Sequence, residues 1–296
     1  MSSIEIEGRR LALTNLDKLL WPEAGRTKAW LIEYYSRVAP VLLSHLAQRP
    51  LTLRRFPDGI DGPSWHQNEC RGEPEWFHVF ETTGRGGRSL RFCVVDDLSS
   101  LVWLANEAVI ELHTFQWLLE APRQPTTLVF DLDPGPPADL ADCARVALWL
   151  RGLLEELRLA SWPKTSGSLG LHVHVPLGRP HEGERVKAFA RAVAEALAQQ
   201  HPDEVVAAME KRSRSGKVFV DWLQNDPTRQ TVAPYSLRGM PFPTAAVPVG
   251  WEEVERGVAE GRPETLTFLG EDVLERLDRR GDLFAEVLEL EQPLPF

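Results

Sequence analysis

The chain has 296 residues, of which 43% are hydrophobic, and a formal net charge of −10 at pH 7. This length suffices for one large or two small domains with a substantial core. No apolar run approaches the roughly 18 residues that a membrane-spanning helix needs, and the N-terminus is not a signal peptide. We expect no contact with a membrane, and the net charge at first argues against a nucleic-acid partner.

The negative charge is concentrated at the C-terminus. Residues 251–296 contain 13 acidic and 5 basic residues, so residues 1–250 carry a net charge of only −2. Basic residues gather in the pair Arg54-Arg55 and in the segment 211–217, which has four positive charges and no acid. Phosphate binding needs such local clusters and not a basic whole protein. The alternative for 211–217 is a solvated turn.

The three cysteines, Cys70, Cys93 and Cys143, lie far apart in the sequence and lack the spacing of a zinc site. A reducing cytosolic compartment fits this pattern.

Local patterns predict the elements of the first 117 residues. We expect a hairpin over 4–13, a helical turn over 15–20, a helix from a Thr27 cap to about residue 46, strands at 51–56, 76–80 and 90–95, a helix to 108 capped by Asp96 or Asp97, and an apolar segment at 110–117.

The second half alternates strands with helices. We expect a strand up to Asp133, a helix over 139–159, a strand at 171–175, a helix over 184–201, a short segment at 205–209, a strand at 217–222, a Pro-rich surface stretch at 234–248 and an acidic helical tail. This order predicts an α+β core in which helices pack on one sheet. Without internal repeats or low-complexity linkers, we expect one domain with two lobes.

The most informative motif is TTLVFDLDPG at 126–135, an apolar run that ends in two aspartates. Because side chains alternate along a strand, Asp131 and Asp133 point to the same face. Neighbouring carboxylates repel each other unless a cation separates them, and Mg²⁺ or Mn²⁺ suits oxygen ligands. The alternative is a pair of solvated aspartates at a turn.

A third carboxylate, Asp221, follows the apolar strand VFV at 218–220. If both strands belong to one sheet, Asp221 joins Asp131 and Asp133, and three carboxylates can hold the two metal ions of a phosphoryl displacement. The alternative is an ion pair between Asp221 and a nearby Arg or Lys.

The segment KTSGSLGLH at 164–172 can aim backbone N–H groups at an anion, with Ser166 and Ser168 as further donors. It is otherwise a Ser/Gly turn before a strand. His172 and His174 share a strand face and could bind a transition metal, but no third ligand is near. His113, within an apolar segment, and Arg238, within a Pro-rich loop, could contact phosphate. Their alternatives are a satisfied core histidine and a solvated arginine.

Taken together, these residues resemble the polymerase domain of bacterial ligase D, in the archaeo-eukaryotic primase superfamily. The resemblance runs nearly the full length and includes LTNLDK at 13–18, WP at 21–22, TK at 27–28, ELH at 111–113, VFDLDPG at 129–135, TSGS at 165–168, GLH at 170–172, GKVFVDW at 216–222 and APYSLR at 233–238. Each motif is weak alone, but their order and spacing are specific.

The resemblance implies an α+β primase-polymerase fold with a central catalytic sheet flanked by helices. It implies one domain over 1–296, with an N-terminal lobe over about 1–110, a catalytic core over about 111–250 and an acidic tail over 251–296.

The implied activity is two-metal nucleotidyl transfer. It adds ribonucleotides or deoxyribonucleotides from NTP or dNTP to DNA 3′ ends and fills gaps during non-homologous end joining, with Mn²⁺ or Mg²⁺. Implied partners are DNA ends with a 5′-phosphate, Ku and a DNA ligase. We expect a monomer in the bacterial cytoplasm, associated with the nucleoid.

Site residues are carried over by position. The resemblance assigns metal binding and catalysis to Asp131, Asp133 and Asp221; nucleotide binding to His113, Ser166, Ser168, His172, Gln224, Arg238 and Arg54, with Arg55 beside it; the 5′-phosphate pocket to Asn15, Lys18 and Lys28; and the end-bridging loop to Lys211 and Arg214.

One position departs from the family. Relatives usually have Lys where this chain has Leu169, so one charge of the triphosphate cradle is missing. The chain shows no ligase or nuclease domain, and a stand-alone protein and one part of a longer chain both remain open. Two other functions remain open as well: a metal-dependent nuclease or phosphohydrolase, and a non-catalytic module that bridges DNA ends.

Overall fold

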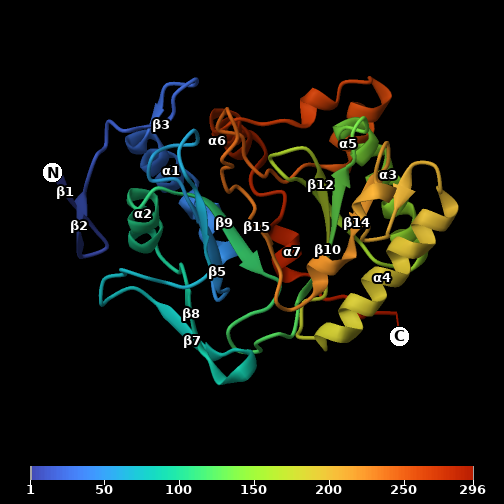
Figure 1. The fold of residues 1–296 in the computed structure, drawn as a ribbon, viewed down its shortest axis with the longest axis horizontal. Helices are drawn as coiled ribbons and strands as arrows, with labels where there is room; N and C mark the ends of the chain where they lie inside the picture. The colour runs from blue at the N-terminus through green and yellow to red at the C-terminus, as the bar shows by residue number, and fades with distance from the viewer. Residues whose placement is uncertain (1, 296) are drawn as a thin grey trace.

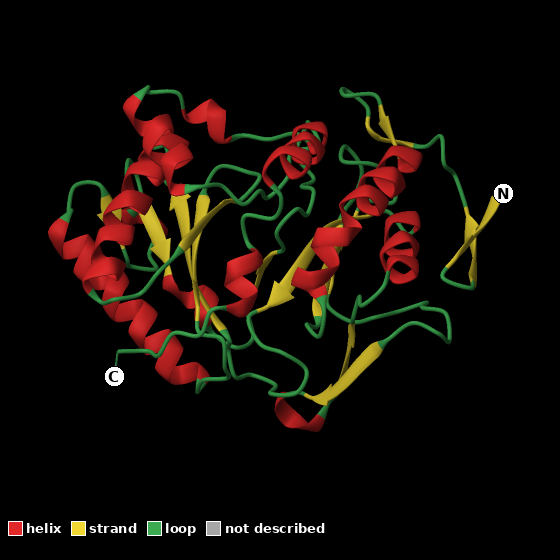
Figure 2. Cartoon of the chain, turned by 180° about the vertical axis from the view of Figure 1, so that it is seen from behind, coloured by secondary structure: helices red, strands yellow, loops and turns green. Residues whose placement is uncertain are grey.

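The computed structural model describes residues 2–295. Two β-sheets lie side by side, with the helices mainly on their outer sides (Figure 1). Seen from behind, loops occupy much of the region between the sheets (Figure 2). The α+β class expected from the sequence is confirmed. Among residues 2–295, no helix has the length and apolar character to span a bilayer.

The N-terminal segment begins with the expected hairpin, β1 (Ser2–Ile6) and β2 (Arg9–Leu13). The predicted helical turn over 15–20 is wrong in its second half, because residues 19–21 form strand β3 (Leu19–Trp21) paired with β4 (Arg26–Thr27). Helix α1 (Lys28–Leu46) begins as predicted, since the Thr27 side chain accepts a hydrogen bond from the Trp30 backbone.

The first sheet has six strands. Its order is β15 (Gln230–Val232), β9 (Val109–Phe115), β5 (Leu51–Arg55), β8 (Ser89–Cys93) and β7 (Val79–Thr83), with β6 (Trp65–Gln67) paired to β5. The strand predicted at 76–80 begins three residues later, and a 3₁₀ turn (Arg85–Gly87) joins β7 to β8. Asp97 caps α2 (Leu98–Asn106), so of the two predicted caps it is the one used.

The second sheet has five strands, in the order β11 (Trp162–Thr165), β12 (Leu171–Pro176), β10 (Thr127–Pro134), β14 (Val218–Asp221) and β13 (Val205–Val206). Only β13 and β14 run parallel. Leu128, Phe130 and Leu132 of β10 are fully buried. They alternate with Asp131 and Asp133, which therefore point away from α3 (Leu140–Glu156) and α4 (Gly183–Gln200).

The Pro-rich stretch after β15 does not lie on the surface, so that expectation is wrong. Most of residues 232–249 are buried, and isolated β-bridges join them to β11 and to the start of α6 (Gly270–Arg280). Burial is possible because these backbone groups find partners, for example in hydrogen bonds from Tyr235 N to Ala246 O and from Ala245 N to Phe268 O. The tail is helical as expected, with α5 (Trp251–Ala259), α6 and α7 (Ala285–Glu289).

The cysteines do not behave as expected. Cys70 and Cys93 form a disulfide, and Cys143 is a buried free thiol. The backbone N–H of Cys70 donates to the carbonyl of Arg91, which lays the 70–72 loop alongside β8. The disulfide joins residues 23 positions apart, and the spacing of the cysteines in the sequence does not reveal this pairing.

Candidate active site

A row of polar side chains crosses the second sheet. Lys164 lies opposite His172, His172 opposite Asp131, and Asp131 opposite Asp221, on four successive strands. Residues directly opposite in an antiparallel pair share one face of the sheet. Asp133 lies two residues beyond Asp131 on that face. The sheet therefore brings the three predicted carboxylates and His172 together.

Polar contacts connect this row. The His172 Nε2 atom is 3.2 Å from Asp131 Oδ1. Gln224 lies in the 3₁₀ turn (Trp222–Asn225) after β14, and its Nε2 donates to Oδ2 of both Asp131 and Asp221, at 3.3 Å each. Asp221 also accepts a hydrogen bond from the Leu223 backbone at 3.0 Å. Gln224 therefore lines the carboxylates, at a position that the resemblance had assigned to nucleotide binding.

The electrostatics of the row favour binding of a cation. Loss of hydration raises the pKa of Asp131. The pKa of Asp133 is raised by loss of hydration and then by repulsion from Asp131 and Asp221, and loss of hydration and the Asp131 charge likewise raise the pKa of Asp221. Burial lowers the pKa of His172 well below its usual value, and the charges of Lys164 and Arg238 lower it further. The histidine is therefore neutral, while the carboxylates would be stabilised by positive charge.

The donor set fits a hard divalent metal. Carboxylate oxygens are the ligands that Mg²⁺ and Mn²⁺ prefer, and a cation would relieve the repulsion among the three aspartates. Among residues 2–295, however, no group of three His, Cys, Asp or Glu side chains is already arranged around one point as a metal site. A cation held between Asp131 and Asp221 would compete with the Gln224 amide.

The loop between β11 and β12 borders the row. Ser166 is buried, and its Oγ accepts hydrogen bonds from the backbone N–H groups of Ser168 and Gly170, at 3.2 and 3.1 Å. The predicted anion nest is therefore wrong for these two donors, because a side chain already satisfies them. Ser168 Oγ lies 3.7 Å from the sulfur of Met240. Leu169 is 65% exposed, so the position where the resemblance led us to expect Lys is open to solvent.

A buried carboxylate on β9 joins the remaining predicted nucleotide residues, and the sequence reasoning did not assign it a role. Glu111 is 1% exposed. Its Oε1 lies 3.1 Å from Arg54 Nη1, and its Oε2 lies 3.0 Å from His113 Nε2 and 3.4 Å from Arg238 Nε. Burial by itself would raise the pKa of Glu111, but the His113 hydrogen bond and the Arg238 charge lower it to about 2. The signal in the sequence was an acid inside an apolar strand.

Arg238 also contacts the second sheet. Its Nη1 donates to the backbone oxygen of Ser166 at 2.7 Å. Arg238 therefore connects Glu111 of the first sheet with the Ser166 loop of the second, and its charge lowers the pKa of both Asp131 and Asp133. Arg55, which follows Arg54 in the chain, forms its ion pair with Glu107 instead, with 2.7 Å between Nη2 and Oε2.

The three residues predicted to bind a 5′-phosphate lie together near the N-terminus. Backbone hydrogen bonds link them, from Lys18 N to Asn15 O and from Lys28 N to Lys18 O. Lys28 is buried, and its Nζ donates to Thr14 Oγ1 and to Asn106 O. Lys18 is more exposed and pairs with Asp58 at 2.7 Å.

The two residues predicted for the end-bridging loop differ in how exposed they are to solvent. Lys211 is exposed. Arg214 is half-buried, with its guanidinium 3.5 Å from the centre of the Phe219 ring, and its charge lowers the pKa of Asp133 and Asp221. Its carbonyl approaches Gly135 so closely that a Cβ there would lie 1.9 Å away, which explains the glycine after Asp133-Pro134.

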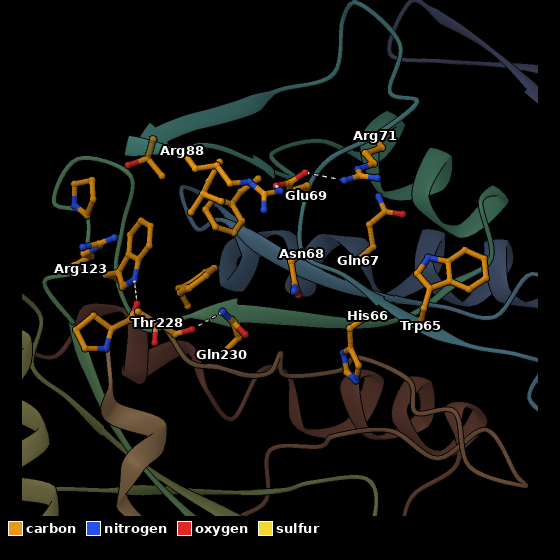
Figure 3. A pocket seen from close by; sticks show the side chains of 17 residues that line it. Trp65, His66, Gln67, Asn68, Glu69, Arg71, Arg88, Arg123, Thr228 and Gln230 are labelled. Atoms are coloured by element: carbon orange, nitrogen blue, oxygen red, sulfur yellow. Dashed lines mark hydrogen bonds and ion pairs between the residues drawn. The ribbon is translucent and has the colours of Figure 1, made fainter. Parts of the chain in front are cut away.

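A cavity of about 540 Å³ lies beside the Glu111 cluster, lined by β6, β8, β9 and the segment before β15. Trp65 and Arg123 lie at opposite ends of it, and Glu69 bonds to Arg71 at its rim (Figure 3). His66 connects it to the candidate site, since its ring centre is 6.1 Å from that of His113. The cavity joins aromatic, amide and guanidinium groups, a combination that suits nucleic acid.

Three aspartates on one face of antiparallel strands, next to a serine loop and an arginine-histidine cluster, are the arrangement expected of a nucleotidyltransferase of the primase-polymerase class. The family described as "LigD, primase-polymerase domain" matches residues 27–284. The chain belongs to this family. Polymerase domains of this kind act on nucleoside triphosphates with divalent metal.

Individual proteins similar to this chain support the same family assignment. The chain is 39% identical to a multifunctional non-homologous end joining DNA repair protein, LigD, of Mycobacterium tuberculosis, over 97% of this chain and 38% of that protein. It is 29% identical to a bifunctional non-homologous end joining protein, LigD, of Bacillus subtilis, over 97% of this chain and 45% of that protein. The chain thus spans less than half the length of these relatives.

A solved structure matches the fold closely. The polymerase domain of M. tuberculosis ligase D in complex with DNA is 38% identical and has a TM-score of 0.89, with 96% of this chain and 99% of that chain covered. The primase-polymerase fold expected from the sequence is confirmed.

Proposed function

We propose that the chain adds nucleotides, preferably ribonucleotides, to DNA 3′ ends and fills gaps during double-strand-break repair by non-homologous end joining. One observation carries this proposal: His172, Asp131 and Asp221 lie directly opposite one another on three adjacent strands, with Asp133 on the same face. The match to a polymerase domain bound to DNA supports it.

The carboxylates would hold the metal ions. Asp131 and Asp133 would contribute to both sites, and Asp221 would contribute to the catalytic one. When bound, two Mn²⁺ or Mg²⁺ ions would activate the primer 3′-hydroxyl and neutralise the leaving pyrophosphate. Asp131 would hold the neutral His172 ring in a fixed position beside the metal ligands, through the 3.2 Å contact between Oδ1 and Nε2.

Two arginines and a histidine would hold the incoming nucleotide. Arg238, Arg54 and His113 would face the triphosphate, Ser166 would lie near the ribose, and Ser168 would also contact the nucleotide. Arginine suits this task because its planar donors pair with two phosphate oxygens at once. These charges are in place before the substrate arrives, so they stabilise developing charge without reorganisation.

The N-terminal pocket would recruit gapped DNA. Lys18, Lys28 and Asn15 would bind the 5′-phosphate of the downstream strand, while Lys211 and Arg214 would help to bring two ends together. Affinity then falls as salt concentration rises. We propose Ku and a DNA ligase as partners, a monomeric state, and a place at the bacterial nucleoid.

Primer extension tests the proposal. Gapped DNA with a 5′-phosphate is incubated with NTP or dNTP in Mn²⁺ or Mg²⁺, and products are separated by length. We expect extension by the wild type and none by the double variant Asp131→Ala/Asp133→Ala. Robust extension by that variant would refute the assigned roles. Shortened DNA would indicate a nuclease, release of free phosphate in place of pyrophosphate a phosphohydrolase, and DNA binding without incorporation under any metal an end-bridging module.

A further inference from the structure

Glu111 occupies the centre of a cluster that the proposed function uses but does not explain. Its two oxygens contact three side chains from three different segments: Arg54 on β5, His113 on β9 and Arg238 in the loop after β15. The backbone N–H of Gly239 also donates to Oε1, at 3.0 Å. One carboxylate therefore anchors both the side chain of Arg238 and the loop that carries it.

Glu111 is more deeply buried than its three partners. The Glu111 side chain is 2% exposed, whereas the side chains of His113, Arg238 and Arg54 are 15%, 18% and 32% exposed. The carboxylate thus lies beneath the three groups, and their outer edges remain open to a ligand. A substrate phosphate would meet the arginines and the histidine, and not the acid.

Charge explains why such an anchor is needed. Two arginines directed to one point repel each other, and the repulsion is stronger near a protein interior than in water. Burial and the Arg238 charge lower the pKa of His113, so the histidine adds a polar contact and not a third positive charge. Glu111 cancels one positive charge and leaves the cluster net positive, which still attracts a triphosphate. Removing one partner of a buried ion pair leaves the other charges uncompensated, so they would move apart.

The contacts of Arg238 show that Glu111 orients this side chain as well as balancing its charge. The Arg238 Nε–Oε2 separation of 3.4 Å is that of an ion pair and not of a hydrogen bond, while Nη1 of the same guanidinium donates to Ser166 O at 2.7 Å. The guanidinium is thus held from both ends, between the first sheet and the serine loop of the second.

We propose that Glu111 is a positioning residue for the incoming nucleotide, holding Arg54, His113 and Arg238 in the arrangement that receives the triphosphate. This inference rests on the proposed function, because it assumes that these three residues bind NTP. It predicts that loss of the carboxylate weakens nucleotide binding without altering DNA binding.

The variant Glu111→Gln tests this prediction, since it keeps the shape of the side chain and removes its charge. We expect the KM for NTP in gap filling to rise about tenfold, which corresponds to about 1.4 kcal/mol, with kcat changed less than about threefold. The affinity for gapped DNA, measured by anisotropy without NTP, should stay within about twofold of the wild-type value.

Two further variants complete the experiment. Glu111→Asp keeps the charge on a shorter side chain, and we expect a KM between those of the wild type and Glu111→Gln. Glu253→Gln is the matched control, because Glu253 is a partly buried acid that, like Glu111, pairs with two arginines, Arg276 and Arg280, and accepts a backbone N–H. It lies on α5, and we expect an unchanged KM.

An unchanged KM in a folded Glu111→Gln protein overturns the inference. A rise in KM accompanied by equally large falls in kcat and in DNA affinity also overturns it, because that result would indicate a structural role. If Glu111→Gln fails to fold, Glu111→Asp decides, and a wild-type KM for that variant overturns the inference. Failure of the proposed function would give a different result from failure of this inference. The wild type itself would then incorporate no nucleotide, and a fluorescent NTP analogue would bind the wild type and Glu111→Gln with the same affinity.

Discussion

Asp131 and Asp221 lie directly opposite each other on the antiparallel strands β10 and β14, and one side chain, Gln224, donates to both. Two residues 90 positions apart in the sequence thereby share one small region of a sheet. Loss of hydration raises the pKa of both carboxyls, and the Asp131 charge raises that of Asp221 further. The arrangement costs stability and gains affinity for a cation.

Asp221→Asn separates the cost in stability from the gain in affinity for a cation. We expect nucleotide incorporation to fall at least about 100-fold, because metal stabilisation of the transition state contributes several kcal/mol. The thermal midpoint without metal should stay the same or rise, since a repelled carboxylate is removed. Asp226→Asn is the control: Asp226 pairs with Lys187 and bonds to Thr228, so its loss should lower the midpoint and leave activity intact. A destabilised but active Asp221→Asn protein would contradict the expectation.

Gly170→Ala tests the approach of the serine loop to β10. A Cβ at this position would lie 2.1 Å from the carbonyl oxygen of Leu132, which is backbone and cannot move aside. We expect a loss of about 1–3 kcal/mol in the free energy of unfolding, and lower activity, because the Ser166 loop must shift.

Gly152→Ala provides the comparison. Gly152 lies within α3, and a Cβ added there would meet no atom of residues 2–295 within 4 Å beyond its own helix backbone and chain neighbours. The substitution should therefore stabilise the helix by about 0.5–1 kcal/mol. Urea unfolding measures both variants, and a similar effect of the two substitutions would contradict the steric argument.

The pH dependence of stability should report on Lys164. Burial lowers the pKa of this lysine to about 7, and its Nζ donates to Val232 O at 3.1 Å. In the unfolded chain the group binds its proton near pH 10.4, so between about pH 10 and pH 7 the unfolded state holds more protons than the folded state. The free energy of unfolding therefore falls as the pH is lowered through this window.

Lys164→Met should remove that component. We expect a flatter dependence of the free energy of unfolding on pH from about 7 to about 10, measured by urea titration in the presence of a chelator. Parallel curves for the wild type and the variant would show that Lys164 does not titrate in this range.

Leu169→Lys adds to the serine loop the charge that the resemblance led us to expect there. Because Leu169 is 65% exposed, the substitution should not disturb packing. We expect the KM for NTP to fall about fivefold, corresponding to about 1 kcal/mol for an exposed charge pair. Leu288→Lys, at an exposed leucine of α7, should leave the KM unchanged. A KM that does not change with Leu169→Lys would place the triphosphate away from this loop.

Lys18→Ala should reduce the preference for a 5′-phosphate. The wild type is expected to bind gapped DNA with a 5′-phosphate more tightly than DNA with a 5′-hydroxyl, and the variant should lose most of this difference. The slope of log affinity against log salt should decrease by about one. Lys187→Ala, whose partners are Glu184 and Asp226, serves as control. Equal binding of both DNAs by the wild type would rule out the phosphate pocket.

The sequence alone determined the local elements and the faces of single strands. The sequence predicted the Thr27 cap, and narrowed the next cap to Asp96 or Asp97, because a cap depends on residues within one turn. The alternation in β10 placed Asp131 and Asp133 on one face, since it too depends only on neighbours in the chain. The motifs also identified the family, because their order along the chain is itself a property of the sequence.

The tertiary structure decided everything that depends on register and burial. It paired Asp131 with Asp221, placed Lys164 in the same row, buried the Pro-rich stretch, and joined Cys70 to Cys93. It also made Glu111 the centre of the arginine-histidine cluster. Strand pairing is set by contacts between residues far apart in the chain, and hydration depends on what covers a side chain, so neither can be read from local periodicity.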